Sequence, residues 1–379
     1  MAFTPTQDIS SNRILSLDVF RGLVVVAMIL VNNPGDWLHI YPVLEHAPWN
    51  GCTPTDLIFP FFLFIVGISI VFAFESKRIN NSLHRELILK AVKRALILFF
   101  LGIILSLFPK FDWSVVRIPG VLQRISLVYF FSAFIFLKCS FRFQLIFSIC
   151  VLVGYNLALG FFSTKGIGIG SYEPDTNIGA WLDRSLLTIP HLYKQAKTWD
   201  PEGIFSTFPA LITGLTGVMV GTWIRKKNIN MPDKLLVIAL IGFILFVLGS
   251  IWSLFFPLNK SLWTSSFVLY TGGLAMLSFT TLYWIIDVKK IVFWTKPFLV
   301  FGVNAITVFF LSGITARILN FIKISWGGKE QNLLQFLYQW AFVPCFSPIN
   351  ASLAGAIILI LIWLGILWIL HHFKIIIKI

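Results

Sequence analysis

Residues 44–67 read LEHAPWNGCTPTDLIFPFFLFIVG and decide the fold of the chain. The second half of this stretch opens an apolar run of about 20 residues, the length that a helix needs to cross the hydrocarbon core of a bilayer. We therefore expect a membrane-spanning helix over 54–75. The first half places His46, Trp49 and Asn50 in a proline-containing turn at the mouth of that helix.

The composition extends this conclusion to the whole chain. Of its 379 residues, 57% are hydrophobic and only 12% are charged, whereas soluble domains are about half apolar and about a quarter charged. The sequence predicts an all-α, polytopic membrane protein. The net charge of +14 occurs without a basic helix or stripe, so nucleic-acid binding is not expected. The four cysteines show no CxxC spacing, and no metal site is predicted.

Ten apolar segments of suitable length are bounded by proline, glycine or charge. They are 15–33, 54–75, 88–108, 119–138, 141–162, 204–224, 234–256, 262–286, 296–317 and 350–371. A shorter amphipathic stretch, 331–343, predicts an interfacial helix, with a re-entrant segment as the alternative. No soluble domain remains, so residues 1–379 are predicted to form a single membrane-embedded domain.

The distribution of lysine and arginine orients these spans. One alternating set of loops, which includes both termini and the dense basic loop 76–94, holds 18 of the 30 basic residues, and the other set holds 10. Loops rich in Lys and Arg stay in the cytoplasm. The sequence therefore predicts cytoplasmic termini and two long loops, 33–54 and 163–203, on the outer side.

Polar residues at membrane depth are costly and each one is a candidate functional residue. Asp18 and Arg21 lie on one face of the first span, where an interfacial ion pair is the alternative interpretation. Asn32 and Asn33 end that span, where helix capping is the alternative.

Four further sites follow along the chain. Gln123 and Arg124 lie inside the fourth span, and Arg124 is also interpretable as one half of an ion pair, for example with Asp56. Glu202 precedes the sixth span, where a carboxylate also suits a helix N-terminus. The remaining candidates are Lys260, Trp263 and Asn304, for which interfacial anchoring and helix–helix contact are the alternatives.

His46 is the candidate with the clearest chemistry. Its side chain has an unperturbed pKa near working pH, about 6.5, so histidine can act as a general base or a nucleophile. A rigid turn follows it, and Asp56 lies one or two turns into the next helix. A loop histidine without function is the alternative.

Seven stretches together resemble one family, the transmembrane heparan-α-glucosaminide N-acetyltransferases and their bacterial homologues. They occur in the family's order and cover nearly the whole chain. They are SLDVFRG (16–22), VNNPGDW (31–37), HAPWNGCTPTDLIFPFFLFIVG (46–67), RIPGVLQRISLVYF (117–130), DPEGIFSTFPALITGLTG (200–217), PLNKSLWTSSFVLYTGG (257–273) and FGVNAITVFF (301–310).

The resemblance implies transfer of the acetyl group of cytoplasmic acetyl-CoA to a glucosamine amino group across the membrane. It implies that His46 is catalytic, with Asn32 as a helper, in a homodimer of a bacterial cytoplasmic membrane. The expected acceptor-binding residues are Asn33, Trp49, Asn50, Asp56, Glu202, Lys260 and Trp263. The expected acetyl-CoA-binding residues are Arg21, Arg94, Gln123, Arg124 and Asn304.

Two other classes of protein fit the residues alone. A multi-pass transporter or channel for a small polar solute would use Asp56 and Arg124 as coupling residues. A structural or assembly membrane protein would not need a polar route across the bilayer. No inverted repeat or pair of broken helices is visible in the sequence, which disfavours the transporter.

Overall fold

The computed structural model describes residues 14–78, 83–162, 170–326 and 328–377. Its α-helices are α1 (Leu15–Asn32), α2 (Pro54–Arg78), α3 (His84–Leu107), α4 (Val121–Lys138), α5 (Phe141–Phe161), α6 (Ile178–Leu187), α7 (Thr207–Arg225), α8 (Met231–Trp252), α9 (Ser265–Tyr283), α10 (Lys296–Val303), α11 (Ala305–Phe321), α12 (Leu333–Leu337) and α13 (Pro348–His372). The shorter elements are the 3-10 turns η1 (Pro42–Leu44), η3 (Trp113–Val115) and η4 (Ile189–His191), the π-helical turns η5 (Trp284–Val288) and η6 (Tyr338–Phe342), and the strands β1 (Lys323–Trp326) and β2 (Lys329–Asn332).

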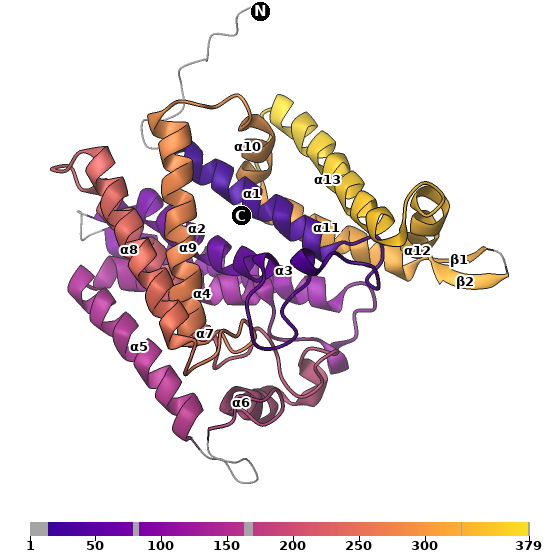
Figure 1. The fold of residues 1–379 in the computed structure, drawn as a ribbon, viewed down its shortest axis with the longest axis horizontal. Helices are drawn as coiled ribbons and strands as arrows, with labels where there is room; N and C mark the ends of the chain where they lie inside the picture. Colours follow the sequence, from indigo (N-terminus) through magenta and orange to yellow (C-terminus); the bar gives the residue numbers. More distant parts are fainter. Residues whose placement is uncertain (1–13, 79–82, 163–169, 327, 378–379) are drawn as a thin grey trace, which may run out of the picture.

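The all-α, polytopic prediction is confirmed, and each of the ten predicted spans is helical (Figure 1). Among the described residues, eight helices are long and apolar enough to cross a membrane. The helix α3 is 24 residues long, but its first half carries several charged side chains. The remaining span is the pair α10 and α11, which bends by 81° at Asn304.

One prediction about local structure is wrong, a second holds over most of its length, and one element was not predicted. The span 296–317 is not one continuous helix, because it breaks at Asn304. The helix predicted over 331–343 is found over 333–342 as α12 followed directly by η6, whereas residues 331–332 belong to β2. The strands β1 and β2 form an antiparallel hairpin, with Lys323 opposite Asn332, that the sequence did not predict.

Parts of the predicted topology lie outside the described residues. These parts are Arg13 with the rest of the N-terminal segment, residues 79–82 of the basic loop, and residues 163–169 of the long outer loop.

Glycines bring the central helices into backbone contact. A Cβ atom on Gly67 of α2 would lie 2.0 Å from the carbonyl oxygen of Gly214 in α7, and one on Gly217 would lie 2.0 Å from that of Phe64. Such close approach of small residues is typical of helix pairs in membranes, where van der Waals packing replaces the hydrophobic driving force. The pair formed by α2 and α7 is therefore the tightly packed centre of the molecule.

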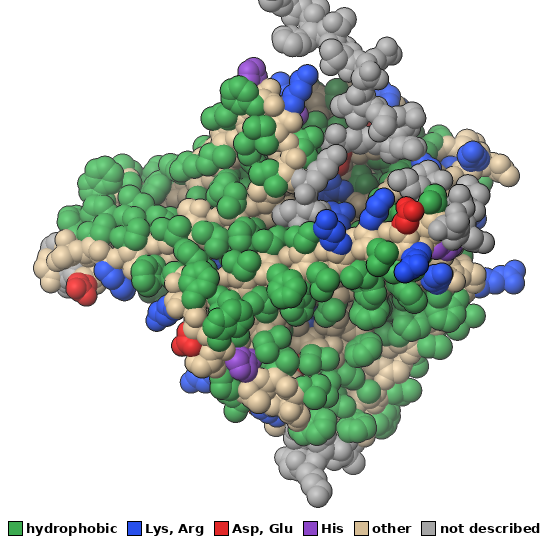
Figure 2. All heavy atoms as spheres, turned by 180° about the vertical axis from the view of Figure 1, so that it is seen from behind, with side chains coloured by type: hydrophobic (Ala, Val, Ile, Leu, Met, Phe, Trp, Pro, Cys, Tyr) green, Lys and Arg blue, Asp and Glu red, His purple; other side chains and the backbone are tan. Residues whose placement is uncertain are grey.

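The outer helices present apolar side chains to the surroundings. In the candidate spans of α5, α8 and α13, only 28%, 22% and 17% of the residues are buried. Figure 2 shows hydrophobic side chains over most of one face of the molecule, with the charged side chains gathered in a few places. A surface of this kind is stable against lipid tails, in agreement with the membrane assignment.

Candidate active site

The turn before α2 is held in place by the start of that helix. Asp56 lies in the first turn of α2, and its Oδ2 accepts the backbone N–H groups of Thr53 (3.1 Å) and Ala47 (3.0 Å). The bond from Asp56 back to the N–H of Thr53, three residues earlier, is half of a capping box. Pro54 lies at the first helical position, where proline is favoured. The same bonds fix the turn that carries His46.

His46 contacts the other oxygen of this carboxylate. Its Nδ1 lies 2.7 Å from Oδ1 of Asp56. The Asp56 side chain is 1% exposed, whereas that of His46 is 50% exposed. A buried carboxylate that accepts from Nδ1–H fixes the tautomer of the ring and leaves the lone pair on Nε2. The pair therefore has the arrangement of an oriented general base that solvent can reach.

Lys260 completes the cluster from a loop far away in the sequence. Its Nζ lies 3.0 Å from Nδ1 and 3.3 Å from Nε2 of His46, and 3.5 Å from Oδ1 of Asp56. Burial lowers the pKa of Lys260 below its ordinary value, although Asp56 and Glu202 act in the opposite direction. The loop before α9 thus inserts an amino group into the mouth of the site.

Hydrogen bonds join the two loops that form this cluster. The amide of Asn259 donates to Oδ1 of Asn50 at 3.1 Å, and the N–H of Gly51 donates to the carbonyl of Leu258 at 2.7 Å. Gly51 adopts a φ of +121°, which favours glycine. Trp49 donates from Nε1 to the carbonyl of Tyr172 at 2.9 Å. Of the predicted acceptor-binding residues, Asn50 and Trp49 therefore also hold the loops together.

A buried ion-pair network lies behind the cluster. Arg117 donates from Nε and Nη2 to the two carboxylate oxygens of Asp200, at 2.8 and 2.6 Å, and also pairs with Glu202. Burial alone would raise the pKa of Glu202, but the charges of Arg117, Arg124 and Lys260 outweigh it and lower the pKa. Glu202 thus links Lys260 electrostatically to Arg117.

Arg124 and Trp263 occupy the core rather than an accessible surface. The guanidinium of Arg124 donates to the carbonyl of Gly203 at 3.1 Å and to Ser206, and it lies 5.2 Å from the centre of the Trp263 ring. The proposed ion pair between Arg124 and Asp56 is therefore wrong. Trp263 is 1% exposed and packs edge-on against Phe59, so it contacts the core and not the solvent.

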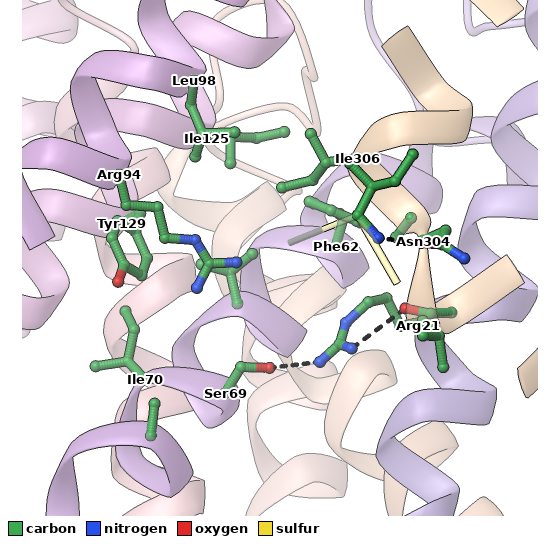
Figure 3. Close-up of a pocket in the computed structure, with 16 residues that line it drawn as sticks. Arg21, Phe62, Ser69, Ile70, Arg94, Leu98, Ile125, Tyr129, Asn304 and Ile306 are labelled. Atoms are coloured by element: carbon green, nitrogen blue, oxygen red, sulfur yellow. Dashed lines mark hydrogen bonds between the residues drawn. The ribbon is translucent and has the colours of Figure 1, made fainter. Parts of the chain in front are cut away.

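The inner cavity, of about 330 Å³, gathers three of the residues predicted to bind acetyl-CoA: Arg21, Arg94 and Asn304. In Figure 3 the two guanidinium groups approach the cavity from opposite sides. Arg21 donates to Ser69 at 2.8 Å and pairs with Asp18 at 2.9 Å. Arg94 lies 5.1 Å from the ring centre of Tyr129, and in the described part of the chain no carboxylate pairs with it.

The sequence interpretation of Asn304 as a helix–helix contact is also wrong. Asn304 lies at the break between α10 and α11, and its Oδ1 accepts the backbone N–H of Ile377 at 3.1 Å. Ile377 itself lines the inner cavity. The side chain therefore holds the segment after α13 against that cavity.

A second cavity, of about 210 Å³, lies closer to the predicted outer side. Asn32, Asn33, Arg117, Gln123 and Arg317 all line it. The amide of Asn33 donates to the carbonyl of Ile29 at 2.9 Å, as expected for helix capping. No hydrogen bond joins Asn32 to His46 within the described residues. The predicted helper residue thus lines the outer cavity and does not bond to His46 directly.

The two cavities follow the same four helices, α1, α3, α4 and α11. On α3 the lining passes from Leu98 in the inner cavity to Gly102 in the outer one, which is about one helical turn. Gln123 lines the outer cavity and packs against Gly102, because a Cβ atom on that glycine would be 2.2 Å from its Oε1. Its buried Nε2 has no hydrogen-bond partner among the described residues. Both cavities are therefore lined by polar residues of the same four helices.

Sequence reasoning missed Arg317, which lines the outer cavity together with Arg117. The signal was present, since Arg317 falls within the last predicted residues of the span 296–317 and a charge at that depth is a functional candidate. It also missed Ser69 and Tyr129, which contact the two arginines of the inner cavity. Neither side chain differs from an ordinary polar or aromatic residue of a membrane helix.

Comparison with known proteins supports one family. Residues 13–256 match the profile of the heparan-alpha-glucosaminide N-acetyltransferase catalytic domain. The chain is 32% identical over 362 residues to the mouse heparan-alpha-glucosaminide N-acetyltransferase, and 31% identical over 351 residues to the human one. These alignments cover 80% and 78% of the chain and 54% and 52% of the relatives. The chain thus spans about half the length of both relatives. It belongs to the heparan-alpha-glucosaminide N-acetyltransferase family.

Proposed function

We propose that this chain is an acetyltransferase that moves the acetyl group of cytoplasmic acetyl-CoA to the amino group of a glucosamine-containing glycan on the outer side of the membrane. The names of its relatives support the reaction class. The contact of 2.7 Å between His46 and Asp56 carries the proposal, because it supplies an oriented base at a solvent-accessible helix mouth on the predicted outer side.

The proposed chemistry is direct transfer. With Nδ1–H held by Asp56, Nε2 of His46 removes a proton from the acceptor ammonium. The free amine attacks the thioester carbonyl, so that the new C–N bond forms as the C–S bond breaks, and the CoA thiolate takes up a proton. Asn32 of the outer cavity is proposed to donate to the oxyanion. Transfer through an acetylated His46 is the second route, and it would give ping-pong kinetics.

Acetyl-CoA is proposed to bind from the cytoplasmic side with its phosphates near Arg21 and Arg94. Guanidinium groups bind phosphate through paired, charge-assisted hydrogen bonds. Among the described residues, no carboxylate pairs with the guanidinium of Arg94. Asn304 lines the same cavity and Gln123 lines the outer cavity, so both are proposed contacts along the thioester arm. Arg124 is proposed to act only indirectly, through Gly203 and Trp263.

The acceptor is proposed to meet His46, Asn50 and Lys260 at the surface, with Glu202 behind them. We also propose a homodimer in a bacterial cytoplasmic membrane, which the family resemblance favours. An amino sugar of a bacterial envelope glycan fits the reaction class.

One observation favours the alternative of a transporter, namely the broken helix formed by α10 and α11. Transporter sites are typically formed by two such helices in corresponding halves of the chain. Among the described residues only this one bent pair is found. The sequence similarity to acetyltransferases therefore outweighs the evidence of this single bent pair.

The test is acetyl transfer by the purified chain in a neutral detergent. Radiolabelled acetyl-CoA and glucosamine should yield labelled N-acetylglucosamine. Replacing the base in His46→Ala, or its partner in Asp56→Asn, should lower kcat by about 10²- to 10⁴-fold, with elution as a folded monodisperse particle as the control. Folded protein that binds CoA and acetylates no amino sugar would contradict the enzyme. Unchanged activity of both variants would contradict this site.

A further inference from the structure

The amino group of Lys260 lies against the imidazole of the proposed base. Its Nζ lies 3.0 Å and 3.3 Å from the two ring nitrogens of His46 and 3.5 Å from Asp56. In the proposed function, the amine of a glucosamine also has to come within reach of this imidazole. The chain therefore holds a primary amine of its own beside its base.

Burial shifts Lys260 towards the neutral form that attacks a thioester, although Asp56 and Glu202 act in the opposite direction. Its side chain is 22% exposed, and burial lowers its pKa. A protonated amine has no lone pair, so a larger neutral fraction makes the nitrogen a better nucleophile. The backbone around it is fixed, because the adjacent Asn259 is fully buried and its Oδ1 accepts the N–H of Leu262 at 2.8 Å. The amino group is thus positioned and not merely nearby.

We propose that Lys260 is a self-acetylation site: with acetyl-CoA bound and no amino sugar present, the enzyme acetylates Nζ of its own Lys260. This inference rests on the proposed function. In the step, His46 takes a proton from Nζ and the nitrogen attacks the thioester carbonyl. The C–N bond forms, the C–S bond breaks, and the thiolate receives the proton, so acetyl-CoA and lysine give acetyl-lysine and CoA.

The modification ends turnover, because an amide does not pass its acetyl group on as a thioester does. Acetylation also removes the charge of Lys260 and adds bulk beside His46. An acceptor that fills the site displaces the Lys260 amino group from His46. Acceptor glycan therefore protects the enzyme, and acetyl-CoA alone inactivates it.

The test uses the full chain in a neutral detergent with acetyl-CoA and no acceptor, followed by digestion and mass spectrometry. We expect at least half of the Lys260 side chains to carry an acetyl group. Lys323, on the exposed strand β1, is the matched control for non-enzymatic acetylation and should remain at least tenfold lower. Excess glucosamine should reduce the acetylated fraction of Lys260 at least fivefold. This comparison uses the wild-type chain alone.

Two further measurements separate the outcomes. The acetyl group on Lys260 should survive treatment with hydroxylamine, which removes an acetyl group from imidazole. The substitution His46→Gln should lower the acetylated fraction of Lys260 at least tenfold. If glucosamine is acetylated while Lys260 stays at the level of Lys323, only the self-acetylation inference is overturned. If neither is acetylated, the proposed function is overturned together with it.

Discussion

At the scale of single residues, the molecule separates cations that are already neutralised from those that are not. Arg117 has two carboxylate partners and Arg21 has one. Arg94, by contrast, faces the inner cavity beside the Tyr129 ring, and among the described residues no carboxylate pairs with it. The unneutralised guanidinium is the one expected to hold a phosphate.

Arg94→Gln should therefore raise the KM for acetyl-CoA about tenfold, since one charge-assisted hydrogen bond is worth roughly 1.5 kcal/mol. Its kcat should change less than about twofold, because the arginine does not touch the reacting atoms. Lys93→Gln is the matched control, as Lys93 lines a different, apolar groove along α3. Steady-state kinetics with varied acetyl-CoA measures both, and equal KM values in the two variants would contradict the phosphate role.

A second prediction at this scale concerns pH. Burial raises the pKa of Asp183 from 3.8 to about 6, so the folded state keeps a proton that the unfolded state loses. This contribution to stability is present below pH 3.8 and is lost as the pH rises to about 6. Acidification from pH 7 to pH 5 should thus stabilise the wild type relative to Asp183→Asn by roughly 1 kcal/mol. Unfolding curves at both pH values measure this, and an identical pH response of the two proteins would refute it.

At the scale of elements, the backbone contact of α2 with α7 determines where the site lies. Gly217→Ala places a Cβ atom 2.0 Å from the carbonyl oxygen of Phe64, so the helices must separate. We expect a loss of about 1 to 3 kcal/mol in unfolding free energy, together with lower kcat, because α2 carries Asp56.

Gly154→Ala in α5 is the control for this substitution. No atom lies within 4 Å of a Cβ at that position, and alanine is the better helix former by up to about 1 kcal/mol. Thermal unfolding in detergent should therefore rank Gly154→Ala at or above the wild type and Gly217→Ala below it. The opposite order would show that the glycine contact is not needed.

The elements were predictable where one apolar run suffices, and unpredictable where two distant segments meet. A helix of about 20 apolar residues needs no tertiary partner to be recognised, which is why all eight helices of the described chain that are long and apolar enough to cross a membrane overlap predicted spans. Hydropathy carries no information about the direction of a helix axis, so the bend at Asn304 was not predicted. His46 and Asp56 share one loop and helix start, whereas the contact of Lys260 with His46 joins residues 214 positions apart. The spacing of one sequence contains no signal for that contact.

At the scale of the whole molecule, the proposed reaction has a direction. The proposed phosphate ligands Arg21 and Arg94 line the inner cavity, whereas the histidine cluster lies on the predicted outer side. In sealed vesicles of known orientation, acetyl-CoA supplied on the cytoplasmic face should acetylate glucosamine trapped on the opposite face. Acetyl-CoA and glucosamine supplied together on the cytoplasmic face should give at least tenfold less product. Equal yields from both arrangements would contradict transfer across the membrane.

Gln123 has a further consequence for the cell that contains this protein. A continuous water-filled passage between the two cavities would let protons and ions leak and would dissipate the membrane potential. The Gln123 side chain lines the outer cavity and packs against Gly102, and it stands two residues before Ile125 of the inner cavity on α4, so it fills space where the two cavities approach each other along that helix. A small residue at position 123 should therefore burden the host with ionic leakage before any defect in acetylation becomes visible.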